Sequence, residues 1–148
     1  MSASERLGSR ARPVAWPAAA GAVLAAASIG LSAYASHGLD APQARANVQM
    51  ACLYAFGHGV ALAALWGQAG TRLGRGSLCA LLLGTLLFSG SLAGGALAGW
   101  PTRLAPAGGM LMIGGWLAWA VSVLRRALDD AMRRFGVTNQ AHFLESPE

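Results

Sequence analysis

The chain has 148 residues, of which 55% are hydrophobic and only 11% are charged. An ordinary soluble domain carries about 25% charged residues, and a soluble protein this short could not cover its surface with so few. All 11 basic residues are arginines, and they lie almost wholly between and outside the hydrophobic stretches, whereas a nucleic-acid-binding protein gathers them on one face. We therefore expect a protein whose partner is the lipid bilayer, and no nucleic-acid partner.

Four stretches without charged residues organise the chain, at 13–39, 46–71, 76–102 and 104–124. A helix of about 20 apolar residues crosses the hydrocarbon core, and backbone groups in lipid require helices or a closed barrel. The stretches lack the alternation of apolar and polar residues that is typical of barrels. The predicted spans lie near residues 14–35, 48–66, 78–99 and 105–124.

The predicted fold class is an all-α membrane protein, a bundle of four transmembrane helices over residues 14–124. Residues 1–13 and 125–148 are expected to form tails. Residues 125–135 alternate basic and acidic pairs, which favours an extension of the last helix beyond the membrane. Residues 136–148 are expected to be a loose end.

Arginine positions predict the orientation of the spans. The N-terminal tail, the second connection and the C-terminal tail together carry nine arginines, whereas the opposite side carries only Arg45 and Arg103. The positive-inside rule therefore places both termini in the cytoplasm. Trp16, Trp66 and Trp100 lie at span ends, where amphipathic rings prefer the membrane interface.

The first 35 residues also admit a second interpretation, as a cleaved secretory signal. Arginines precede an apolar run that ends in Ala33-Tyr34-Ala35, which has the A-x-A pattern of a cleavage site. The run is longer than the usual apolar region of a signal peptide. We therefore favour a retained first span, which mass spectrometry of the N-terminus would test.

Glycines predict where helices pack in the membrane. Gly90, Gly94, Gly95 and Gly99 form overlapping G-x-x-x-G pairs in the third span, and small residues let helix backbones approach closely. We expect these four to form a packing face, against a helix of this chain or of another.

Polar side chains within the spans are the candidate functional residues, because they are costly in lipid. No Asp, Glu or Arg falls within a predicted span, which argues against a proton-coupled exporter. His58 and Ser89 lie near mid-depth, so we expect that they could hydrogen-bond. His37, just past the first span, and Ser91 complete the set of candidates, either as sites or as packed residues.

The candidates do not indicate a metal site or an active site. His37 and His58 differ in depth by roughly 15 Å at the helical rise per residue, too far apart to share one metal ion. Cys52 and Cys79 lie near opposite membrane faces, which argues against a disulfide. No protease, zinc or nucleotide motif occurs. We expect no catalysis, no metal and no cofactor.

Several motifs resemble a known family of small membrane proteins of unknown function. Ser36-His37-Gly38-Leu39 resembles an AHGL signature, and residues 84–92 (GTLLFSGSL) are similar to its GT..FSGSL segment. Residues 54–63, 106–109 and 115–116 also fit. The family includes the bacterial YgdD-like proteins and human transmembrane protein 256. The resemblance implies four transmembrane helices and a bacterial inner (plasma) membrane location, and it implies no activity. This chain departs from the family at Ser36, at residues 56–57 and at Ala93, where a tyrosine is common.

Three functional hypotheses follow. The first is a non-enzymatic scaffold or accessory subunit that forms a homo-oligomer or binds a membrane-protein partner. The alternative is a small transporter or permeability factor with a site around His58 and Ser89. The third is a membrane enzyme or haem protein that uses His37 and His58, against which the difference in depth argues.

Overall fold

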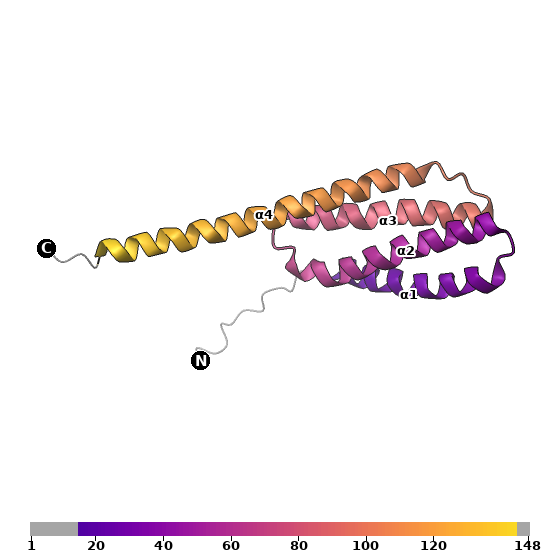
Figure 1. The fold of residues 1–148 in the computed structure, drawn as a ribbon, viewed down its shortest axis with the longest axis horizontal. Coiled ribbons are helices and arrows are strands. Elements are labelled where there is room, and N and C mark those ends of the chain that lie inside the picture. The colour runs from indigo at the N-terminus through magenta and orange to yellow at the C-terminus, as the bar shows by residue number, and fades with distance from the viewer. Residues whose placement is uncertain (1–14, 145–148) are drawn as a thin grey trace, which may run out of the picture.

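The computed structural model describes residues 15–144, with side chains for residues 15–136. The helices are α1 (Trp16–Gly38), α2 (Pro42–Leu65), the short 3-10 turn η2 (Trp66–Gln68), α3 (Arg72–Ala98) and α4 (Leu104–Leu144), as Figure 1 shows. Each of the four α-helices is long and apolar enough to cross a membrane, and the described residues form no strand. The predicted all-α class with four transmembrane helices is confirmed.

The four helices are neighbours in space in the order in which they follow one another in the chain. The main contacts join α1 to α2, α2 to α3, and α3 to α4, whereas α1 and α3 touch only marginally. Consequently α1 and α4 lie at opposite edges of the assembly, and the start of α1 and the far end of α4 lie at the same end (Figure 1). The edge helix α1 is the least covered by the rest of the chain.

Local sequence explains where the helices begin and end. Prolines occupy the first turns of α1 and α2, where the missing N–H costs no hydrogen bond. Thr71 caps α3, because its side chain accepts a hydrogen bond of 2.9 Å from the N–H of Gly74. Gly99 ends α3 in the left-handed region at φ 67°, which glycine adopts without steric cost. Arg45 donates two hydrogen bonds to the carbonyl of Leu39, just after α1.

Two pairs of glycines bring the helix backbones into contact. A β-carbon added at Gly21 of α1 would lie 2.5 Å from the carbonyl oxygen of Gly59 in α2, and one added at Gly59 would lie 2.5 Å from the Gly21 oxygen. Gly84 of α3 and Gly108 of α4 form a second reciprocal pair, at 2.9 and 2.7 Å. The α1–α2 hairpin and the α3–α4 hairpin are therefore each closed by contact between backbones.

The glycines predicted as a packing face do not meet another helix of this chain. A β-carbon at Gly90 would touch nothing within 4 Å. At Gly94 and Gly95 it would meet Trp100 and Thr102, which belong to the connection between α3 and α4. Gly94 and Gly95 therefore face the chain's own connection, and a packing face against a helix of another chain stays a prediction.

Helix α4 is much longer than a membrane span requires. Its 41 residues correspond to about 60 Å at the helical rise per residue, roughly twice the thickness of the hydrocarbon core. Figure 1 shows its second half projecting past the other helices. The prediction that the last helix continues through residues 125–135 is confirmed, and the location of this part outside the membrane stays a prediction. The predicted loose end was wrong for residues 136–144, which continue the helix, and residues 145–148 lie outside the described part.

Candidate functional site

Four aromatic or imidazole side chains from three helices meet around His58. Tyr54 and His58 lie one turn apart on α2, with ring centroids 6.0 Å apart. The ring of Phe88 on α3 lies 4.8 Å from that of Tyr54. Trp116 on α4 lies 6.0 Å from His58. The group therefore links α2 to α4 across α3, although these two helices are not neighbours in the chain.

Hydrogen bonds define which nitrogen of the His58 ring carries the hydrogen. The indole N–H of Trp116 donates to Nε2 of His58 at 3.1 Å, so this nitrogen is an acceptor. Nδ1 lies 2.8 Å from the carbonyl oxygen of Tyr54, and a carbonyl can only accept, so Nδ1 carries the hydrogen. Both contacts are those of the neutral Nδ1–H tautomer. They use both ring nitrogens of His58 within the protein.

The expected hydrogen bond between His58 and Ser89 is not formed. His58 binds Trp116 and the backbone of Tyr54 instead, and it lines a cavity of about 260 Å³. Ser89 lines a different cavity, between α1, α2 and α3. The prediction was wrong because similar depth does not place two residues on facing sides of their helices. A site shared by both residues therefore has no geometric basis.

The remaining polar candidates do not join the His58 group. His37 is exposed in the last turn of α1, outside the cavity that His58 lines. Within the described part of the chain, the hydroxyls of Ser89 and Ser91 are buried without a hydrogen-bond partner. Among the described residues, no group of three or more His, Cys, Asp or Glu side chains is arranged to hold a metal ion.

A second polar group at the arginine-rich end was not predicted. Arg126 donates to the carbonyl oxygen of Gln68, and its guanidinium carbon lies 5.9 Å from the centroid of the Trp119 ring. Nearby, the hydroxyls of Thr71 and Ser122 are 2.8 Å apart. These contacts fasten the connection between α2 and α3 to α4. The sequence indicated only that the paired arginines at 125–126 set the orientation of the helices, and it did not predict their contacts with the connection between α2 and α3.

Comparison with known proteins identifies the family. Residues 31–109 match the family model described as "Protein of unknown function (DUF423)". The chain belongs to the DUF423 family. The match runs from within α1 to the first turns of α4, so DUF423 covers His37, His58 and Ser89 but not Trp116. No curated protein and no solved structure matches the chain.

The family match also bears on the predicted resemblance. DUF423 is a family without an assigned role, in agreement with the expectation of a small membrane protein of unknown function. The narrower resemblance to the YgdD-like proteins and transmembrane protein 256 stays a prediction.

We predict that the hydrogen bond between His58 and Trp116 stabilises this DUF423 protein. In a double-mutant cycle of His58→Leu and Trp116→Phe, we expect a coupling energy of about 0.6–1.7 kcal/mol, as for other polar contacts between membrane helices. The free energy of unfolding would be measured for all four proteins in detergent micelles. Strictly additive effects would contradict a stabilising role for this bond.

Proposed function

We propose that this DUF423 protein is a non-enzymatic scaffold of the bacterial inner membrane. Copies of it associate through the part of α4 that projects from the membrane. The positive-inside rule puts that projection in the cytoplasm, because it lies at the arginine-rich end of the helices.

An exposed apolar stripe on the projecting helix carries the proposal. Leu128, Met132 and Phe135 are 54%, 64% and 75% exposed, and their spacing of four and three residues places them on one face of the helix. Charged pairs at residues 125–126, 129–130 and 133–134 surround the stripe, which indicates that this segment lies in water. An apolar stripe of this spacing is typical of a helix that pairs with another helix.

A second copy of the chain fits this stripe better than an unrelated helix. All copies insert with the same orientation, so their projecting helices run parallel. All copies also sit at the same height, so Leu128 of one copy faces Leu128 of the next without any shift in register. The membrane thereby supplies much of the alignment that parallel helix pairing requires.

The state of His58 also supports a structural role over catalysis or transport. Both of its ring nitrogens are engaged within the protein, and Ser89 belongs to a different cavity. The alternative of a transport site built from both residues therefore has no support in the geometry.

Cysteine crosslinking tests the proposal. Leu128→Cys and Met132→Cys would be introduced one at a time into a background that carries Cys52→Ala and Cys79→Ala. In native membranes, we expect a short bis-maleimide to join two copies at either position. The products would be separated by denaturing electrophoresis and identified by mass spectrometry.

Asp130→Cys is the matched control, because residue 130 faces away from the stripe, about 200° around the helix from Leu128 at 100° per residue. It should crosslink far less than Leu128→Cys. Equal crosslinking on both faces would indicate random collision and would overturn the proposal. Crosslinks from the stripe to a different protein would replace self-association with a partner.

A further inference from the structure

Two arginines are held at the connection between α2 and α3 by backbone carbonyls. Arg75 donates from Nε to the carbonyl oxygen of Ala69 at 3.2 Å, and Arg126 of α4 donates to that of the preceding residue, Gln68. The Arg126 guanidinium also lies over the Trp119 ring. A carbonyl positions a guanidinium without cancelling its charge, so both positive charges are held against one short segment of the chain.

No carboxylate of the described residues pairs with these two guanidinium groups. Asp129 and Asp130 lie about one turn further along α4, and neither makes an ion pair with them. Each guanidinium uses one N–H group on its carbonyl and keeps the rest of its planar fork of donors. Arg72, one turn before Arg75 on α3, is exposed and forms no hydrogen bond or ion pair with the described residues. These three arginines therefore offer charge and free donors to an anion.

The depth of the arginines selects the kind of anion. Arg75 lies three residues before the predicted third span and Arg126 two residues after the predicted fourth, so both are within about 5 Å of the hydrocarbon boundary at the helical rise per residue. The headgroup layer is about 5–8 Å thick on each side of the hydrocarbon core, and lipid phosphates lie in it. By contrast, Arg133 and Arg134 lie about 14–15 Å beyond the fourth span. Arg75 and Arg126 are therefore at the level of the phosphates.

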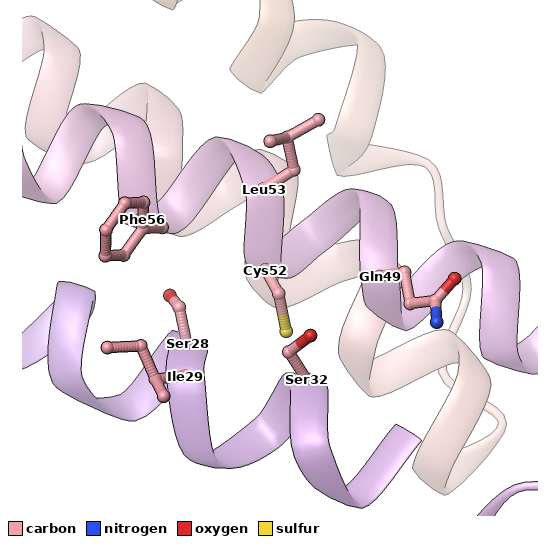
Figure 2. A pocket seen from close by; sticks show the side chains of 7 residues that line it. All are labelled: Ser28, Ile29, Ser32, Gln49, Cys52, Leu53 and Phe56. Carbon is pink, nitrogen blue, oxygen red and sulfur yellow. The ribbon is translucent and has the colours of Figure 1, made fainter. Parts of the chain in front are cut away.

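We propose that Arg72, Arg75 and Arg126 bind the phosphate of an anionic phospholipid. Guanidinium groups match phosphate oxygens in bidentate geometry, and basic sites between membrane helices bind anionic lipid headgroups. On the membrane side of Arg126, Val121 and Leu124 are 43% and 61% exposed, which gives the acyl chains an apolar surface. The groove of about 460 Å³ between α1 and α2 has no charged residue in its lining (Figure 2), so it offers no such site. The arginine site is separate from the α4 stripe proposed for self-association.

Lipid titration followed by native mass spectrometry tests the site. Phosphatidylglycerol and phosphatidylcholine with the same chains would be added separately to the full chain in a neutral detergent, and the bound fraction would be measured. We expect phosphatidylglycerol to bind more tightly. Arg75→Gln together with Arg126→Gln should weaken its binding about thirtyfold, because each arginine beside a lipid surface strengthens binding about fivefold. Glycerol 3-phosphate, which has the phosphate without the chains, should not compete at equal concentration.

Arg133→Gln together with Arg134→Gln is the matched control, because it removes the same charge from the same end of the protein. It should change the binding much less than the first pair. Arg72→Gln should weaken binding about fivefold, and it decides the question if the variant of Arg75 and Arg126 does not fold, since Arg72 holds no other described residue. Thermal unfolding would verify that each variant is folded.

Three results would overturn the proposal. Equal binding of the two lipids, or an unchanged affinity in a folded arginine variant, would mean that the arginines do not form a lipid site. An equal loss of binding in the matched control would mean diffuse attraction between charges. Competition by glycerol 3-phosphate would indicate a soluble phosphate ligand in place of a lipid.

Discussion

Replacing Gly59 with alanine should separate α1 from α2 and lower the stability of the protein markedly. The new methyl group would lie 2.5 Å from the Gly21 carbonyl oxygen and 3.0 Å from the Ala25 nitrogen. Both are backbone atoms, so no side-chain rotation can relieve the overlap. Overpacking by a single methyl typically costs about 1–3 kcal/mol, and we expect the upper part of this range in the free energy of unfolding.

Gly57→Ala is the internal control for this prediction. Gly57 lies two residues earlier on the same helix, and an added β-carbon there would meet nothing within 4 Å. Alanine favours helix over glycine by up to about 1 kcal/mol, so this variant should be neutral or more stable. Thermal unfolding in the same detergent would compare the two. A Gly59→Ala protein as stable as Gly57→Ala would contradict the close approach of α1 and α2.

The corresponding change between α3 and α4 is Gly108→Ala, with a similarly large expected effect. Its methyl group would lie 2.5 Å from the Phe88 nitrogen and 2.7 Å from the Gly84 oxygen. The strain falls beside Phe88, which packs on Tyr54, so it should also disturb the group around His58. We expect a loss of about 2–3 kcal/mol in the free energy of unfolding, with a change in the near-ultraviolet circular dichroism of the aromatic rings.

Gly114→Ala serves as the control on α4, because the position is exposed and an added β-carbon would meet nothing within 4 Å. Like Gly57→Ala, this variant should be as stable as the unmodified protein or more stable, and its aromatic spectrum should match that of the unmodified protein. If Gly108→Ala behaved in the same way, the contact between Gly84 and Gly108 would not hold the helices together.

The four helices were predictable because each one corresponds to a long, continuous run of apolar residues, which can be read directly from the sequence. In a membrane, a run of about 20 uncharged apolar residues has few alternatives to a helix that satisfies its own backbone hydrogen bonds. The residues at which the helices begin and end were predicted less accurately than the helices themselves. α3 begins at Arg72 although the predicted span begins near residue 78, because a helix can continue past the hydrocarbon into the interface.

The contacts between helices were harder to predict, because spacing shows which residues share a face but not what that face meets. The dense glycine run at 90–99 indicated a packing surface, yet the close approaches use Gly21 and Gly84, isolated glycines in their helices. A weaker signal was present: Ala25 follows Gly21 by four residues, the small-xxx-small pattern of helix contacts. His58 was identified as a candidate, but its partner Trp116 is 58 residues away in the chain, beyond any local pattern.

The arrangement of the helices in chain order has a consequence for biosynthesis. Each helix after the first packs on the one made just before it, so every new segment that leaves the insertion machinery finds a neighbour already in the membrane. Because the main contacts join consecutive helices, the sequence separation of contacting residues stays small. Folds with such local contacts form rapidly. We therefore expect the α1–α2 hairpin to be in place before translation of α4 is complete.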